Sequence, residues 1–163
     1  MCRCQKRCQI SRDRLHFRVC VERIQDRVEV LTGAKEMVNE YWGIVIAQSL
    51  RDDQILGHLN VISKRRLGGW EFILTSISAD QFADTVATLQ DSMVNIYDDC
   101  WYAHFFRGSE LIVVYQDRVF RVTADPRTWE EAIGYGREHG IPMEQLDFHP
   151  RTKEDARSFF DIA

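Results

Sequence analysis

The sequence lacks the features that mark the common enzyme and membrane-protein classes. It has three prolines and no apolar run that approaches the ~20 residues needed to span a bilayer. It contains no nucleophile elbow, P-loop, dinucleotide-binding glycine fingerprint or H-E-x-x-H motif, and these motifs carry much of the local signal for enzymes. No apolar segment follows the first basic residues, so a secretory signal peptide is not expected. These absences favour a cytoplasmic protein without a membrane partner.

Charge is divided unevenly along the 163 residues. Residues 1–36 hold nine Lys or Arg and five Asp or Glu, whereas the remainder holds 12 basic and 20 acidic residues. An acidic body does not favour general nucleic-acid binding, which needs several cations on one face to neutralise phosphates. We predict an Arg- and Cys-rich N-terminal extension over 1–36, poorly ordered or not native, and a single globular domain over 37–163.

Four of the five cysteines lie in that extension, at Cys2, Cys4, Cys8 and Cys20. Four thiolates can complete a tetrahedral zinc site or hold an iron–sulfur cluster. The spacing C-x-C-x3-C-x11-C contains no C-x2-C pair, so reduced thiols are the favoured interpretation and no cofactor is expected. A further hypothesis is that the native chain begins at Met37, close to where charge and cysteine content change.

The stretch 101–123 predicts three strands joined by two tight turns, at roughly 102–106, 111–115 and 118–123. The middle strand is apolar at every position, which indicates that other parts of the protein cover both of its faces. The third strand alternates between apolar and polar residues, as a strand with one buried face does. Gly108 suits the first turn because glycine adopts a positive φ at low cost. The stretch therefore predicts an antiparallel meander with a buried middle strand.

The preceding part of the chain predicts three further strands. The apolar run at 41–47 is typical of a central strand, and 60–63 and 70–77 are the other candidates. The glycine pair 68–69 suits a tight turn between the last two strands. A single helical turn is expected within 49–57.

Two main helices are predicted. The first spans about 79–94, where Ser78 and Gln81 form a capping pair and the apolar positions share one helical stripe: Phe82, Val86, Leu89, Met93 and Ile96. The second spans 126–139, with Asp125 as its N-cap and Gly140 at its C-terminal end. A terminal helix over 152–160 is a further candidate.

The order of the predicted strands and helices along the chain indicates an α+β fold, a mostly antiparallel sheet with two main helices packed on it. A ferredoxin-like arrangement is one candidate for this fold.

Cys100 and His104 are the candidate catalytic pair. They lie four residues apart at the entry to a strand, so their side chains are expected on the same face, where an imidazole could activate a thiolate. The alternative is that Cys100 is a small buried hydrophobe and His104 a hydrogen-bonded core residue. The interpretation of both residues as part of the core is favoured over the catalytic one.

His139, His149 and Asp147 are the candidate metal ligands. Imidazoles and carboxylates around one loop could bind a divalent cation. His139 also lies where the end of a helix attracts positive charge, which is an ordinary stabilising role. No metal is therefore expected.

Lys64, Arg65, Arg66 and Trp70 are candidate ligand- or partner-binding residues, because cations beside an aromatic ring can contact a phosphate and a stacked base. A solvated turn is the favoured alternative.

Aromatic residues are numerous enough to form a binding patch, and the candidates are Tyr41, Trp42, Trp70, Trp101 and Tyr102. The leading functional hypothesis is a non-catalytic module that binds a protein partner or a small ligand. The alternatives are an enzyme or metal-dependent protein and, more weakly, a nucleic-acid-binding protein.

Overall fold

A computed structural model describes residues 39–94 and 101–163 of the chain. Within these ranges the chain forms six strands and three α-helices, which establishes the predicted α+β class. The predictions for the extension 1–36, its cysteine cluster and Cys100 fall outside the described residues and stay predictions.

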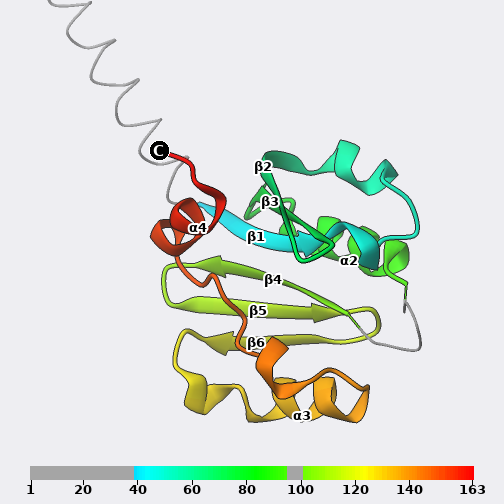
Figure 1. The fold of residues 1–163 in the computed structure, drawn as a ribbon, viewed down its shortest axis with the longest axis vertical. Helices are drawn as coiled ribbons and strands as arrows, with labels where there is room; N and C mark the ends of the chain where they lie inside the picture. Colours follow the sequence, from blue (N-terminus) through cyan, green and yellow to red (C-terminus); the bar gives the residue numbers. More distant parts are fainter. Residues whose placement is uncertain (1–38, 95–100) are drawn as a thin grey trace, which may run out of the picture. The chain divides into compact units, whose positions relative to one another are not determined.

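The strands form one sheet in the order β2-β3-β1-β4-β5-β6, and every pair of neighbours is antiparallel (Figure 1). The strand bounds are β1 Glu40–Ile46, β2 Asn60–Leu67, β3 Trp70–Ser78, β4 Tyr102–Arg107, β5 Glu110–Tyr115 and β6 Val119–Thr123. The α-helices are α2 Phe82–Ser92, α3 Glu130–Glu138 and α4 Lys153–Phe160. Short 3-10 turns are η1 Ala47–Ser49, η2 Gln54–His58, η3 Pro126–Thr128 and η4 Met143–Gln145.

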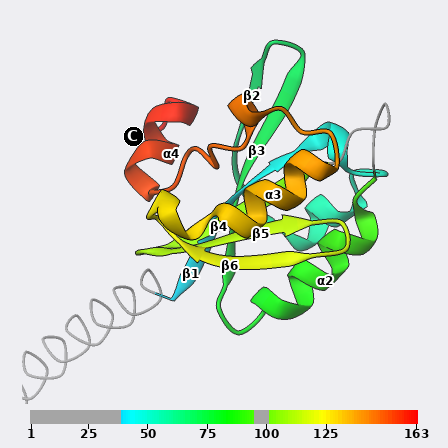
Figure 2. The same cartoon turned by 90° about the horizontal axis from the view of Figure 1, so that it is seen from below.

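The apolar middle strand is buried on both faces, as its pattern predicts. Residues 111–115 of β5 are each at most 1% exposed. α2 contributes Phe82, Val86 and Leu89 to the core on one face of the sheet. α3 and α4 contribute to the core on the other face, so α2 and α3 lie on opposite sides of the sheet (Figure 2). The sheet is therefore the middle layer of three.

The ferredoxin-like arrangement is not confirmed. That arrangement follows the order β-α-β-β-α-β. Here three strands precede α2, three more follow it, and the two remaining helices come last. The helices also cover both faces of the sheet.

The start of α2 differs from the prediction. β3 extends through Ser78, which pairs with Glu40, so this residue belongs to the sheet and does not cap the helix. The Ser78 hydroxyl donates to the Gln81 side-chain oxygen at 3.0 Å, and α2 begins at Phe82. The helix is shorter than predicted because strand pairing continues further along the chain. Ile96, the last residue of the predicted stripe, lies outside the described residues.

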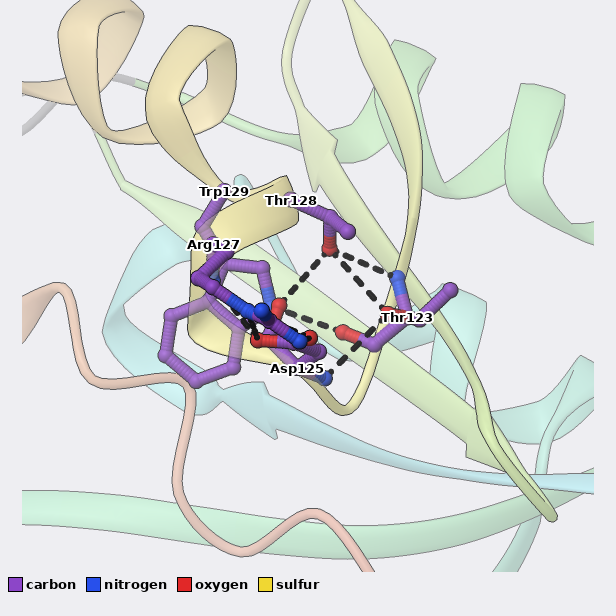
Figure 3. A network of polar contacts seen from close by, with 5 residues as sticks. All are labelled: Thr123, Asp125, Arg127, Thr128 and Trp129. Atoms are coloured by element: carbon purple, nitrogen blue, oxygen red, sulfur yellow. Dashed lines mark hydrogen bonds and ion pairs between the residues drawn. The ribbon is translucent and has the colours of Figure 1, made fainter.

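A polar corner positions the second predicted helix (Figure 3). Asp125 accepts a hydrogen bond from the backbone N–H of Arg127 at 3.0 Å, which is the predicted N-cap, although it caps the 3-10 turn η3 that precedes α3. The Thr128 hydroxyl donates to the Asp125 carbonyl at 2.8 Å. The Trp129 indole donates to the Thr123 carbonyl at 2.7 Å, and its ring is buried and packs edge-on against Phe148 at 5.2 Å. The corner therefore fixes α3 to the end of β6.

None of the helices in the described ranges is long and apolar enough to cross a membrane.

We expect Gly43→Ala to destabilise the domain by about 3 kcal/mol, at the upper end of typical overpacking costs. Gly43 pairs with Phe105 across β1 and β4, and a Cβ at this position would lie 2.0 Å from the Phe105 ring. That ring is fully buried, so it cannot move aside without disturbing the core. Urea denaturation measures the effect, and Gly57→Ala is the matched control because nothing lies within 4 Å of the point where its Cβ would be. Equal stability of the two variants would contradict the packing at Gly43.

Candidate functional site

A concavity of about 400 Å³ opens where the β2–β3 hairpin, the start of β4, the 141–149 segment and α4 meet. Five aromatic side chains define it, and we call it the aromatic pocket: Trp70, Phe72, Trp101, Tyr102 and Phe159. The rest of its lining is Ile46, Leu67, Ile141, Glu144, Gln145, Asp147 and His149. Its volume and its mainly apolar lining with a few polar groups are typical of ligand sites.

Two other concavities have more polar linings. One, of about 450 Å³, lies at the tip of the β2–β3 hairpin and is lined mainly by Gln48, Arg66, Glu71 and the turn glycines. The other, of about 320 Å³, lies along α2 and is lined by His58, Gln81, Asp84, Thr85 and Thr88. Neither lining contains an aromatic side chain other than an imidazole, so the aromatic pocket is the stronger candidate.

Trp70 owes its position to the hairpin. It begins β3 and pairs with Leu67 of β2 across the turn at 68–69. The Gln48 side chain donates to the Gly69 carbonyl at 3.2 Å and accepts from the backbone N–H of Glu71 at 3.1 Å, so both neighbours of Trp70 are held by one side chain. The Trp70 ring packs on Trp101 with 4.4 Å between centroids.

Tyr102 joins the sheet to the 141–149 segment. It begins β4, and its hydroxyl donates to the Gln145 carbonyl at 2.5 Å. Its ring packs edge-on against Phe148 at 5.2 Å. Burial raises the pKa of Tyr102, and the nearby Asp147 carboxylate adds to the rise. The hydroxyl therefore stays protonated at neutral pH and serves as a hydrogen-bond donor.

Phe159 is the contribution of α4. Its ring packs edge-on against Phe72 of β3 at 5.5 Å. The terminal helix predicted over 152–160 is present as α4, and Thr152 caps it: its hydroxyl accepts a hydrogen bond from the backbone N–H of Asp155 at 3.0 Å. The cap sets where α4 begins and hence which residues of the helix reach β3.

The basic residues of β2 are paired with acidic residues. Lys64 and Arg66 both lie near Glu71 of β3, at 3.9 and 3.4 Å. Arg65 contacts Asp161 at 3.2 Å, donates to the Phe159 carbonyl and lies over the Phe159 ring at 5.1 Å. The triplet is part of β2 and not of the turn. Arg65 therefore helps hold α4 against the sheet.

His104 is a hydrogen-bonded core residue. Its side chain lies in β4, the residue is 3% exposed, and its Nε2 donates to the Pro150 carbonyl at 2.8 Å. Burial lowers the pKa of His104 to about 4, against the opposing effects of the Pro150 carbonyl and the Asp147 carboxylate. The imidazole is neutral at neutral pH. It does not line the aromatic pocket.

The three candidate metal ligands do not share one site: His139 contacts Tyr135 of α3, whereas His149 and Asp147 line the aromatic pocket. The His139 ring stacks on Tyr135 at 4.1 Å and its Nδ1 donates to the Tyr135 carbonyl at 2.8 Å, so this residue closes the end of α3. His149 and Asp147 both line the aromatic pocket, and the Asp147 carboxylate accepts from the His149 backbone N–H at 3.1 Å. Within residues 39–94 and 101–163, no three His, Cys, Asp or Glu side chains form a group that could hold a metal ion.

The structure brings three of the five predicted patch aromatics together, at Trp70, Trp101 and Tyr102. Tyr41 and Trp42 instead pack into the cores on opposite faces of the sheet. Sequence reasoning missed the remaining aromatic walls, Phe72 and Phe159. For Phe72 the signal existed, because it alternates with Trp70 on one side of β3.

Comparison with protein-family models, with curated proteins and with solved structures gives no match to this chain.

Proposed function

We propose that the domain is a non-catalytic binding module and that the aromatic pocket is its binding site for a small ligand or a protein partner. The observation that supports this proposal is the concavity of about 400 Å³ lined by aromatic side chains from three separate parts of the chain, β3, the start of β4 and α4. Aromatic walls supply a large apolar contact area, and the few polar groups between them can orient a ligand.

The walls of the pocket are held before any ligand arrives. Gln48 fixes the backbone on either side of Trp70, and the Tyr102 hydroxyl is bonded to the Gln145 carbonyl. Arg65 joins β2 to the end of α4. A preformed site loses less conformational entropy on binding, which favours affinity. The His104 imidazole is buried, bonded to the Pro150 carbonyl and outside the pocket lining, so it would not contact a ligand in the pocket.

A ligand-observed NMR screen of neutral and charged fragments, together with defined short peptides, tests this function on the full chain. We expect hits whose affinity falls at least tenfold in Trp70→Leu, because the variant removes an aromatic wall. Leu67→Ser should weaken the hits about fivefold through lost apolar contact. Met143→Ser is the matched control: Met143 is 53% exposed and outside the pocket lining, whereas Leu67 is 52% exposed and within it. Fragments that bind Trp70→Leu as tightly as the wild type, or the absence of any binding fragment, would overturn the proposal.

A further inference from the structure

The charged side chains that line the aromatic pocket are acidic. Glu144 and Asp147 are both exposed, and the described residues of the lining include neither Lys nor Arg. His149 is the one basic residue among them, and its backbone N–H already donates to the Asp147 carboxylate. A ligand in the pocket would therefore meet two carboxylates beside the aromatic rings.

The Asp147 charge reaches the aromatic wall. It contributes to the raised pKa of Tyr102 and acts on the imidazole of His104 behind it. Tyr102 forms part of the lining, so the same carboxylate would act on a charged group bound against that ring. Attraction of this kind is strongest where apolar walls keep water away.

Two arginines contact lining residues from outside the pocket: Arg65 contacts Phe159 of α4, and Arg151 contacts the backbone of Asp147. Arg65 contacts Asp161 at 3.2 Å and the Phe159 carbonyl. Arg151 donates to the backbone carbonyl of Asp147 at 2.9 Å, and its guanidinium lies 5.2 Å from the centroid of Trp129, which is not a lining residue. Neither arginine is a lining residue, so no guanidinium from residues 39–94 and 101–163 lines the pocket that a ligand cation would occupy.

We propose that the aromatic pocket binds a small organic cation that carries an alkylated ammonium group. The faces of Trp and Tyr rings attract such cations through the ring quadrupole, and the carboxylates of Glu144 and Asp147 complement the charge. The volume of about 400 Å³ lies in the range of whole small-molecule ligands. This inference rests on the proposed binding function and adds the class of ligand.

Three probes of the same shape and different charge test the proposal: choline, its neutral isostere 3,3-dimethylbutan-1-ol, and the anionic 3,3-dimethylbutanoate. Titration calorimetry on the full chain at low salt should give at least tenfold tighter binding of choline than of the alcohol, and the weakest binding for the carboxylate. In Glu144→Gln/Asp147→Asn the preference for choline should fall to about twofold, because both substitutions remove the negative charge while they keep the side-chain shape and one acceptor oxygen. Glu131→Gln/Glu138→Gln is the matched control; it removes two exposed carboxylates of α3 and should keep the full preference.

The outcomes separate this inference from the broader proposal. The neutral alcohol could bind as tightly as choline or more tightly, with an affinity that falls in Trp70→Leu. That result would overturn the cation preference and leave a binding pocket in place. A preference for choline that survives in Glu144→Gln/Asp147→Asn would overturn the role of the two carboxylates. A trimethyllysine peptide is titrated as a fourth probe: its binding without measurable binding of free choline would overturn the small-molecule ligand in favour of a protein side chain. Failure of every fragment in the NMR screen would instead reject the pocket as a binding site.

Discussion

Phe82→Asp is expected to abolish the cooperative folding of the domain. Phe82 is 4% exposed and lies against Tyr41 and Phe105, with ring centroids 4.0 and 5.3 Å away. Truncation of such a side chain alone costs about 3–5 kcal/mol, and a carboxylate at this position would be buried without a partner. The total is comparable with the ~5–15 kcal/mol that stabilises a typical domain.

Circular dichroism during thermal unfolding and gel filtration would measure this effect. Ala83→Asp is the matched control, because Ala83 is the next residue of α2 and is exposed. A carboxylate in the first turn of a helix is favourable, so this variant should melt like the wild type. A soluble Phe82→Asp protein with a wild-type melting curve would contradict the packing of α2 on the sheet.

The stability of the wild-type protein is expected to fall by about 2 kcal/mol between pH 7 and pH 5 through His104 alone. Burial lowers the pKa of His104 in the folded state to about 4, whereas an exposed histidine has a pKa of about 6.5. As the pH falls below about 6.5, the unfolded chain binds a proton that the folded chain does not bind, so the free energy of unfolding decreases. The loss should continue until the pH approaches the folded-state pKa.

Urea denaturation of the wild type and of His104→Gln at several pH values measures this contribution. The glutamine amide can donate to the Pro150 carbonyl, as the imidazole does at 2.8 Å, but it does not titrate. The difference in stability between the two proteins should therefore shift by about 2 kcal/mol in favour of the variant from pH 7 to pH 5. A difference independent of pH would show that the imidazole titrates normally and is not buried as described.

The sheet could be predicted in large part because its signals are local. The continuous apolar run at 111–115, the alternation at 118–123 and the glycine at the first turn each specify a strand or a turn from neighbouring residues alone. β5 and β6 accordingly lie within one residue of the prediction, and Gly108 has a φ of +57°. The strand order could not be read in this way, because the pairing of β1 with both β3 and β4 joins segments far apart in the sequence.

The candidate site was predicted only in fragments for the same reason. Trp70, Tyr102 and His149 each stand out separately in the sequence, but their meeting in one pocket depends on how the hairpin and the 141–149 segment pack. The basic residues of β2 include one contact that the sequence could predict and one that it could not. The pairing of Arg66 with Glu71 follows from the hairpin register, whereas the contact of Arg65 with Asp161 depends on the position of the C-terminal helix.

The four tryptophans allow a direct test of the central claim that the aromatic pocket is the binding site. Trp70 and Trp101 line the pocket, whereas Trp42 and Trp129 have their indole N–H groups bonded elsewhere, to Glu40 and to a backbone carbonyl. Indole ¹H–¹⁵N signals recorded during titration with the tightest ligand should shift, with saturation, for Trp70 and Trp101 and stay in place for the other two. Saturable binding that moves Trp42 or Trp129 and leaves the pocket pair unchanged would contradict the account.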